Sequence, residues 1–598
     1  MTEMALSTAR RIDFASDEAQ AHVRARYRAE ARFKMYGLVA IGLTALFLVI
    51  VLTDIVIKGL PTFTQHSALL DVTISNADVD AKSPLDGDYQ AVVRNTLRAR
   101  FPNVESRTER RALDGIVSSG AADRVRDMVM SDPSLIGKTV PVKLLLSDDA
   151  DLYYKDGTRI EQSPAKGAAT VSGVTGDVTI QSSVADFAGR LKVVKSGLFA
   201  RAQNLRTEAE RQRNFARALE ARKAEIERTL ATATPAVRQE LATITADMES
   251  MTQRADDATK RAGELQARFD AAASEETLDE TVPSVLVRIN GGLVKVTTMT
   301  DTQASGTVIL PLTSAGSAPA GGWQVVTYVV PEANRRVNDR EVSWLEALRA
   351  QGAITSDFNW AFFTSGDSRE PELAGIRGAL VGSALTLFVT LILCLPIGVA
   401  AAIYLEEFAP KNWLTEIIEV NINNLAAVPS IVFGLLGLAM FLNFFDLPRS
   451  APLVGGLVLA LLVLPTIIIA SRAALRAVPP SIKEAALGVG ASQQQAVFHH
   501  VLPPAMPGIM TGTIIGMAHA LGETAPLLMI GMVAFIVEVP TGITDAATAL
   551  PVQIYLWSDL PEIAFQAKTA AAIMVLLVFL FVMNGSAIYL RRQFERRW

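Results

Sequence analysis

The ionisable side chain that stands out in this sequence is Glu523, because it lies inside the long apolar run 507–533. A carboxylate in a membrane span costs about 2.5–3.5 kcal/mol, so such a residue is a functional candidate by default. His519 precedes it by four residues, the spacing of neighbours on one helical face. A carboxylate paired with a base here can gate a path or hold an interface. The structural alternative is that Glu523 satisfies a local helix break beside Pro526.

The sequence has no set of residues with the spacing that a catalytic, metal-binding or nucleotide-binding site requires. Five histidines occur without the H-E-x-x-H pattern of helical zinc sites, and the single cysteine, Cys394, excludes an intrachain disulfide or a cysteine metal cluster. Gly137-Lys138-Thr139 looks like the end of a phosphate-binding loop, but Asp132 stands where its first glycine is required. Charges of both signs are interleaved along 201–228, as on a solvated helix face. We therefore expect no enzyme activity, no metal, no cofactor in this chain and no nucleic-acid partner.

The elements that must position Glu523 are membrane-spanning helices. The chain has 598 residues, 50% of them hydrophobic, a formal net charge of −5 and a mean hydropathy of +0.28. A helix needs about 20 consecutive apolar residues to cross a bilayer. Six runs meet this requirement, at 36–57, 376–404, 422–445, 452–471, 507–533 and 569–590. The expected fold class is an α-helical, multi-pass membrane protein with six transmembrane helices embedded in lipid.

Basic residues near the ends of these runs predict the orientation. Lys and Arg are enriched on the cytoplasmic side of short loops. Five of them lie in 24–34 and four in 591–598, which places both termini, including residues 1–35, in the cytoplasm. The loop 472–505 carries Arg472, Arg476 and Lys483 and is expected there too, whereas the acidic loop after residue 404 is uninformative. Residues 59–374 then lie outside the cytoplasmic membrane.

This external region reads as a mixed α/β domain with a helical insertion. Alternating and β-branched residues separated by Gly turns make 67–195 and 284–330 strand-biased, and we expect the two parts to form one domain. Between them, 196–274 carries apolar residues at alternating steps of three and four. The break TATPAV, with Thr234 placed to cap and Pro235 at the first helical position, predicts an antiparallel coiled-coil hairpin. Such an arm serves equally well as a spacer or as a docking element.

The loop 472–505 contains start and stop signals for two short helices. Ser481 and Glu484 have capping-box spacing, and Gly490 is expected to end the helix that they begin. Ser492 and Gln495 repeat the arrangement, and the prolines after Leu502 are expected to end the second helix. A compact helix pair attached directly to spans on both sides can transmit force from a bound partner.

The same loop resembles the EAA loop of bacterial ABC importer permeases. The resemblance rests on Glu484-Ala485-Ala486, on Gly490 four positions later and on Leu502-Pro503 twelve positions after that, with His500 departing from the usual hydrophobic residue. It implies a type I ABC importer permease core of five transmembrane helices over 375–598. It also implies that the loop is a coupling helix seated in a groove of a separate ATPase subunit, which binds the ATP and Mg²⁺.

A finer resemblance points to phosphate permeases of the PstA type. Residues 520–528 (ALGETAPLL) are similar to the signature of that group, as are residues 421–430 (NINNLAAVPS). The resemblance implies phosphate as substrate, a second PstC-like permease, two PstB-like ATPases and a periplasmic PstS-like phosphate-binding protein. His519 stands where relatives often carry Arg, which leaves open how the positive charge is supplied.

Two alternatives remain open at this point. Sulfate and molybdate permeases share the EAA loop, and a membrane sensor or scaffold would use its external domain to read a ligand or partner. The sensor needs an internal output domain, whereas the largest cytoplasmic segments here have about 34 residues. The translocation or gating residues are predicted from residue type and rough helix face, and they are His519, Glu523, Thr524, Ser383, Thr386, Asn424, Ser430 and Thr513.

Overall fold

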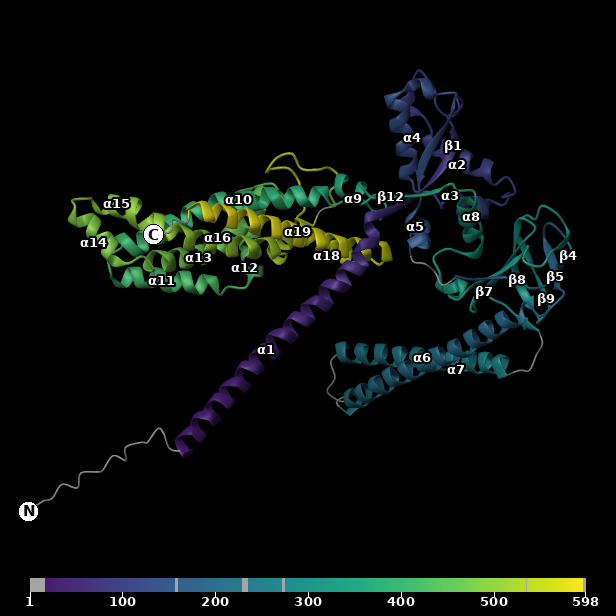
Figure 1. The fold of residues 1–598 in the computed structure, drawn as a ribbon, viewed down its shortest axis with the longest axis horizontal. Helices are drawn as coiled ribbons and strands as arrows, with labels where there is room; N and C mark the ends of the chain where they lie inside the picture. Colours follow the sequence, from purple (N-terminus) through teal and green to yellow (C-terminus); the bar gives the residue numbers. More distant parts are fainter. Residues whose placement is uncertain (1–16, 156–159, 229–234, 271–274, 534, 595–598) are drawn as a thin grey trace, which may run out of the picture. The chain divides into compact units, whose positions relative to one another are not determined.

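The computed structural model describes residues 17–155, 160–228, 235–270, 275–533 and 535–594. The chain forms two compact units (Figure 1). One, the membrane unit, combines Met1–Thr64 with Phe358–Trp598, and the other, the middle unit, is Gln65–Asp357. The middle unit is therefore an insertion between the first span and the remaining spans.

The membrane unit is helical. Its helices are α1 (Asp17–Gly59), α9 (Ala361–Thr364), α10 (Arg377–Ile403), α11 (Trp413–Ala426), α12 (Ser430–Gly437), α13 (Pro452–Arg476), α14 (Pro480–Gly488), α15 (Gln493–Ala496), α16 (Leu502–Gly522), α17 (Ala525–Met529), α18 (Leu550–Ser558) and α19 (Ile563–Phe594). Wider π turns follow three of them, at η6 (Tyr404–Phe408), η7 (Leu438–Phe444) and η8 (Val497–Val501), and a 3-10 turn η1 (Leu60–Phe63) follows α1.

Five continuous helices of the described residues are long and apolar enough to cross a membrane. They are Val23–Phe63, Arg377–Phe408, Pro452–Arg476, Gln493–Gly522 and Ile563–Gln593. A sixth span exists only if a bent pair is counted as one, because Trp413–Ala426 and Ser430–Phe444 meet at 101°. The run 422–445, predicted as one span, is therefore divided between two helices at a sharp bend. Pro429 has no N–H, and its extended backbone separates the two helices.

The run predicted at 507–533 is also interrupted. Helix α16 ends at Gly522, and Glu523 is in an extended conformation with ψ of 117°. The short helix α17 follows with Pro526 in its first turn, and Gly531 then reverses the chain at a φ of +89°. Pro526 cannot donate the backbone hydrogen bond that continuation of α16 would require.

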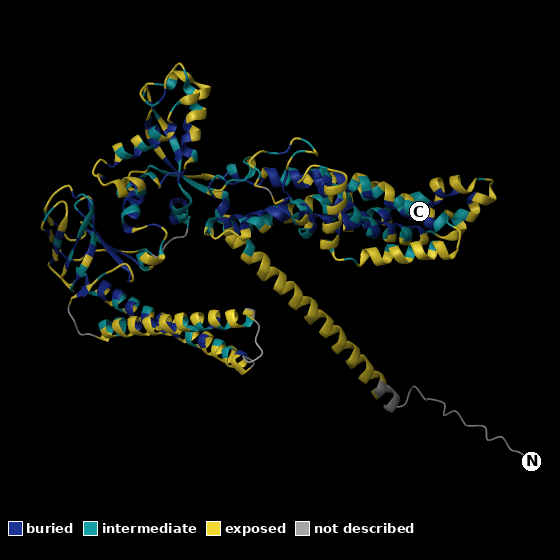
Figure 2. Ribbon diagram, turned by 180° about the vertical axis from the view of Figure 1, so that it is seen from behind, coloured by how far each residue is buried: buried dark blue, intermediate teal, exposed yellow. Residues whose placement is uncertain are grey.

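The centre of the membrane unit is a close contact of α10, α13 and α16. Figure 2 shows that buried residues are concentrated within the helix bundle. A Cβ added at Gly512 would lie 2.2 Å from the Cβ of Ala470, and one at Gly456 would lie 2.5 Å from Val389. Small residues allow helix backbones to approach closely where apolar burial supplies no net drive, as in lipid. Any larger side chain at these two positions would separate the helices.

Helix α1 differs from the bundle helices in its exposure. Its apolar window is entirely unburied, and it touches α19 near its C-terminal end, where Gly59 approaches the backbone of Ala571. The predicted first span, 36–57, lies within this helix, which begins earlier, at Asp17. The exposed apolar surface of α1 therefore faces lipid or another chain.

The middle unit contains both helices and strands. Its helices are α2 (Tyr89–Arg100), α3 (Arg107–Asp114), α4 (Gly120–Ser131), α5 (Asp148–Lys155), α6 (Ala188–Arg228), α7 (Pro235–Asp270) and α8 (Asp339–Ala350). Its strands are β1 (Thr64–Thr73), β2 (Thr139–Leu145), β3 (Ile160–Pro164), β4 (Ala169–Val171), β5 (Asp177–Ser182), β6 (Glu276–Thr277), β7 (Ser284–Ile289), β8 (Gly292–Met299), β9 (Gln303–Leu310), β10 (Gly316–Ala318), β11 (Gln324–Tyr328) and β12 (Ile354–Phe358).

The strand-biased interpretation of 67–195 was wrong for its first half. Four helices, α2 to α5, lie between β1 and β3. Side chains just before two of them accept capping hydrogen bonds, Asp88 from the Ala91 amide and Ser106 from the Glu109 amide. These caps and the apolar spacing of Val92, Val93 and Leu97 direct the segment into helices despite its β-branched residues.

Strands on either side of the helical insertion share one sheet. The order is β10-β4-β5-β9-β8-β7-β11-β3, with β6 added on β8. Antiparallel pairs such as Val325 with Ser163 and Ile180 with Ala304 join segments from before and after the insertion. A separate three-stranded sheet has the order β12-β1-β2. The joining of 160–182 to 284–328 means that the two parts fold together.

Helices α6 and α7 form a hairpin where the heptad pattern occurs. Their seam is rich in alanine, and it includes the buried Ala209, Ala255 and Ala262. At its base the rings of Phe199 and Phe269 lie 5.1 Å apart. The cap predicted at Thr234 lies outside the described residues, and α7 begins at Pro235. Small seam residues bring the two helices close together, which stiffens a long exposed element.

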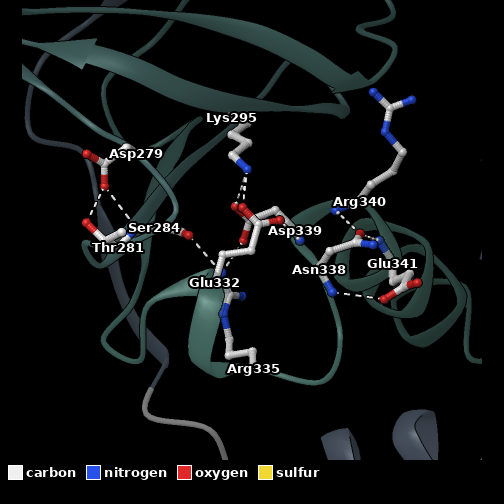
Figure 3. Close-up of polar contacts among 10 residues, drawn as sticks. All are labelled: Asp279, Thr281, Ser284, Lys295, Glu332, Arg335, Asn338, Asp339, Arg340 and Glu341. Carbon is white, nitrogen blue, oxygen red and sulfur yellow. Dashed lines mark hydrogen bonds and ion pairs between the residues drawn. The ribbon is translucent and has the colours of Figure 1, made fainter. Parts of the chain in front are cut away.

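A buried ionic cluster joins the sheet to α8 in the middle unit (Figure 3). Lys295 contacts Asp339 at 2.9 Å and also pairs with Glu332, while Arg335 pairs with Asp339 and donates to the Ser284 hydroxyl at 2.7 Å. The side chains of Arg335 and Asp339 are only 3% and 1% exposed. Burial alone raises the pKa of Asp339, but the charges of Arg335 and Lys295 outweigh it and hold that pKa below its usual value.

Asp339→Asn tests whether this cluster holds the middle unit together. Removing one partner of a buried pair costs about 3–5 kcal/mol, so we expect a marked loss of thermal stability. Because the folded pKa of Asp339 lies below the unfolded value of about 3.9, its stabilisation is present at neutral pH and is lost as the pH falls through the folded pKa. The measurement is thermal unfolding of the full chain against pH, followed by fluorescence of the buried Trp323 and Trp344.

The control is Asp247→Asn, at an exposed position on α7. It should leave the unfolding temperature and its acid dependence unchanged. Equal unfolding temperatures for Asp339→Asn and the parent would show that the cluster contributes no net stability.

Candidate coupling site

The first helix of the candidate coupling loop, α14, differs from the prediction at its start. It begins at Pro480, with Pro479 at the cap position and no side-chain cap hydrogen bond, so the predicted Ser481–Glu484 capping box does not form. The fixed φ of proline suits the first helical position and starts the helix one residue before Ser481. Gly490 ends the turn at a φ of +94°, the left-handed conformation that favours glycine.

The second helix of this loop, α15, is capped as predicted but does not end as predicted. Gln495 accepts from the Ser492 amide at 2.9 Å, and the Ser492 hydroxyl accepts from the Gln495 amide at 3.3 Å. The prediction that Pro503 and Pro504 end this helix was wrong. The chain runs on through η8 into α16, because the wider π turn precedes the prolines and they fall in the first turn of α16.

The knob formed by α14 and α15 presents both acidic and apolar side chains to solvent. Glu484 and Ala485 are exposed, whereas Ala486 is buried. At the tip, Leu487 is 41% exposed and Val489 is 86% exposed. An apolar tip on an otherwise polar helix pair is typical of a docking surface for another protein.

Ion pairs hold this knob to the membrane helices, and we call them the ionic latch. The acidic partners are Glu406 and Glu407, just after α10, and Glu419 on α11. The basic partners are Arg472 and Arg476 on α13 and Lys483 on α14. Arg472 lies 2.6 Å from Glu419 and 3.4 Å from Glu406, and Arg476 lies 2.7 Å from Glu406.

The part of the latch closest to the knob involves Glu407. Its carboxylate pairs with Lys483 on α14, and its backbone carbonyl accepts from Gln493 of α15 at 2.7 Å. Glu407 is only 10% exposed. Both α14 and α15 are therefore tied to Glu407, which lies in η6 directly after α10.

Glu523 and His519 form the pair expected from their spacing. Their side chains meet at 2.8 Å, with Glu523 18% exposed and His519 57% exposed. Glu523 also follows the last residue of α16. It therefore both pairs with His519 and lies at the helix break, as the two interpretations of the sequence had each predicted. The next helix, α17, packs on α12, where a Cβ at Gly434 would lie 2.8 Å from Met529.

The other predicted path residues divide into two groups. Ser383, Thr386 and Thr513 are buried and hydrogen-bonded within the bundle. The Ser383 hydroxyl accepts from the Leu550 amide at 2.7 Å, and the threonine hydroxyls donate to carbonyls one turn earlier in their own helices, at 2.8 and 3.0 Å. Asn424 is exposed, and Ser430 and Thr524 are partly buried. The first group occupies helix contacts; the second lies near the helix breaks.

Comparison with known proteins follows the same division of the chain. The family described as "Binding-protein-dependent transport system inner membrane component" matches residues 394–596, and a domain of unknown function (DUF3333) matches residues 20–163. The phosphate transport system permease protein PstA 2 of Mycobacterium bovis is 33% identical over 243 residues, which cover 40% of this chain and 79% of that protein. The chain belongs to the family of binding-protein-dependent transport system inner-membrane components.

Two further matches are a curated protein aligned over a shorter stretch and a solved structure of lower identity. The probable ABC transporter permease protein YqgI of Bacillus subtilis is 36% identical over 174 residues, 29% of this chain and 58% of that protein, so the match spans little more than half of it. A structure of the MetNI methionine ABC transporter in an inward-facing conformation aligns with 37% of this chain and 96% of its own, at 17% identity and a TM-score of 0.30.

Membership in this family makes the chain a multi-pass inner-membrane transport component and not an enzyme. The family has no cofactor in the permease chain. Among the residues that the structure describes, no group of three or more His, Cys, Asp or Glu side chains could hold a metal ion.

Lys483→Gln tests the ionic latch. A half-buried ion pair of this kind contributes about 1 kcal/mol, so its removal should speed local opening of 480–496 roughly fivefold. The measurement is amide hydrogen exchange of that segment in the intact permease. Lys411→Gln, at an exposed lysine outside the latch, is the matched control and should exchange like the parent. Unchanged exchange in Lys483→Gln would rule out a restraining role for the latch.

Proposed function

We propose that this permease is one half of the membrane channel of an ATP-driven phosphate importer. The observation that carries the proposal is the coupling knob, with exposed Glu484 and Ala485, an exposed apolar tip and a latch to α10. A knob of this construction serves a partner that drives movement. The resemblance to type I importer permeases supports an ATPase as that partner.

Energetics require such a drive. Moving an anion into a negative-inside cell costs about 2.3 kcal/mol per charge per 100 mV, before any concentration gradient is counted. The proposed assembly is this chain, a second PstC-like permease, two PstB-like ATPases that bind ATP and Mg²⁺, and a PstS-like phosphate-binding protein. Closure of the ATPases would displace the knob, and the latch would pass that movement to α10, α11 and α13.

Phosphate is favoured over other oxyanions by residues 520–528 and by the relatives. The M. bovis protein, 33% identical, is named as a phosphate permease. Sulfate and molybdate permeases are the second candidates, since they share the EAA loop. A sensor or scaffold role for the middle unit is the third, and the described cytoplasmic-side segments are too short to form an output domain.

The topology that fits this function places both termini and the knob in the cytoplasm and residues 59–374 outside. The basic residues at 24–34 and near the end of α19 support this orientation. The mixed α/β middle unit then faces the periplasm, where its hairpin is either a spacer or a docking arm.

Of the residues predicted to line the translocation path, we retain those near the helix breaks. His519, Glu523, Thr524, Asn424 and Ser430 are at least partly accessible, and we propose that they line or gate the path together with the second permease. Glu523 repels anions, so its proposed role is to hold His519 in position and gate the opening. Ser383, Thr386 and Thr513 are buried at helix contacts and are instead proposed to lie outside the path.

Glu484→Lys tests ATPase coupling. A charge reversal at a docking hot spot costs about 2 kcal/mol or more, which is roughly a 30-fold weaker association. We expect loss of labelled-phosphate uptake in cells that lack their own permease and supply the cognate partners, with the variant still present in the membrane. Gln593→Lys, the control, introduces a lysine at the end of α19, away from the knob, and should leave uptake intact. Full uptake by Glu484→Lys would remove the basis of the proposal.

Glu523→Gln tests the gate. The amide keeps the size of the side chain but removes the charge that faces His519, and we expect phosphate uptake to fall about tenfold, the effect of 1.4 kcal/mol. Thr513→Val is the matched control, because that hydroxyl bonds only within its helix, and it should transport like the parent. Competition with excess sulfate or molybdate in the same assay identifies the substrate. Stronger inhibition by either than by unlabelled phosphate would contradict the phosphate assignment.

A further inference from the structure

An exposed group of aromatic rings marks the place where the chain leaves the membrane unit. We call Phe63, Phe358, Trp360 and Phe363 the aromatic cap. Phe63 stacks with Phe358 at 6.4 Å and with Phe363 at 5.9 Å, and Phe358 meets Trp360 edge-on at 4.8 Å. Trp360 is nevertheless 67% exposed and Phe358 is 48% exposed. Four rings in contact thus leave a large apolar surface uncovered.

The cap is held on a rigid base by Asn359. This side chain is 3% exposed; its backbone amide donates to the Phe63 carbonyl at 2.9 Å and its side-chain amide to the Thr62 carbonyl at 3.0 Å. Its side-chain oxygen accepts from the Phe362 amide at 3.1 Å. Asn359 therefore clamps the chain that follows α1 to the chain that precedes α10. Because these hydrogen bonds hold the backbone beneath the aromatic cap, the exposure of Phe358 and Trp360 is a property of the folded structure and not a result of loose packing.

The cap lies level with the start of α10. The Ile376 amide, just before that helix, donates to the Phe362 carbonyl at 2.8 Å. At the other end of α10, Tyr404 is 55% exposed and Trp413, at the start of α11, is 67% exposed. Helix α10 has 27 residues, which corresponds to about 40 Å. The hydrocarbon core and headgroup layers of a bilayer together span about 40–45 Å, so exposed aromatic rings occur where both headgroup layers are expected.

Charge at the same level agrees with a lipid headgroup layer. Arg377, the first residue of α10, is exposed, and exposed Arg369 lies over the Phe535 ring at 5.8 Å. Guanidinium groups at a span end pair with lipid phosphates, while Trp and Tyr prefer the boundary between acyl chains and headgroups. The rings and the arginines together match a phospholipid surface better than a water-facing one.

We propose that the aromatic cap is a membrane anchor, seated in the headgroup layer of the leaflet at the N-terminal end of α10. The lipid surface it contacts is continuous with the surface that covers the spans. Because Asn359 joins both chain crossings beneath the cap, the anchor sets the depth of Thr62–Phe63 and of the segment before α10 at the same time.

The test is quenching of tryptophan fluorescence by brominated lipid. The full chain is placed in nanodiscs of phosphatidylethanolamine, phosphatidylglycerol and phosphatidylcholine brominated either near the headgroup end or near the methyl end of the acyl chains. Trp360→Phe removes the reporter from the cap, and Trp413→Phe removes the reporter from the opposite end of α10. Trp323, Trp344 and Trp557 are at most 2% exposed and contribute a common background.

We expect Trp360→Phe to lose a share of bromolipid-quenched fluorescence comparable to that lost in Trp413→Phe, and greater with bromine near the headgroup end. Trp360→Tyr should give the same loss, which guards against misfolding of one variant. If the fluorescence lost in these variants is instead quenched by aqueous iodide and not by bromolipid, the cap faces water or a protein partner and the proposal fails. Quenching by neither agent would place Trp360 in protein and also overturn it.

Discussion

Backbone hydrogen bonding in lipid is the constraint on which the membrane unit depends. No N–H or C=O group can be left open in hydrocarbon, so a span must be a continuous helix unless protein or water satisfies the break. Five helices of the described residues are continuous over the length of a span. The exceptions are the break before Pro429 and the break at Glu523, and both occur where polar side chains are available. The candidate gate residues therefore lie at or near the two helix breaks.

Helix α10 connects the two ends of this unit. One end adjoins the aromatic cap and its Asn359 clamp, and the other carries the glutamates of the ionic latch. Between them α10 contacts α13 through glycines that leave no free space, as at Gly456. A closely packed interior moves in discrete steps and does not deform gradually. A movement that begins at the coupling knob would thus reach the far end of the bundle as a displacement of whole helices.

Much of the secondary structure follows from local spacing, and the corrections arise where longer-range effects decide. The heptads of α6 and α7 and the capping box at Ser492 depend on neighbours within a few residues, which sequence displays directly. The latch escaped prediction because its partners are up to 76 residues apart, as for Glu407 and Lys483, and acidic residues count little in topology rules. Hydropathy measures length and apolarity but not direction, so it could not reveal the 101° bend within 422–445.

The hairpin of the middle unit leaves and re-enters a sheet whose strands already pair across it. Strand β5 before α6 pairs with β9 after α7, and the rings of Phe199 and Phe269 meet where the two helices return to the sheet. Sheet and hairpin are therefore separable modules, since the first does not need the second to bring its strands into register. The base of the hairpin is a natural splice point, where evolution can lengthen, shorten or exchange the arm and a protein engineer can graft a reporter domain, with the remaining fold preserved.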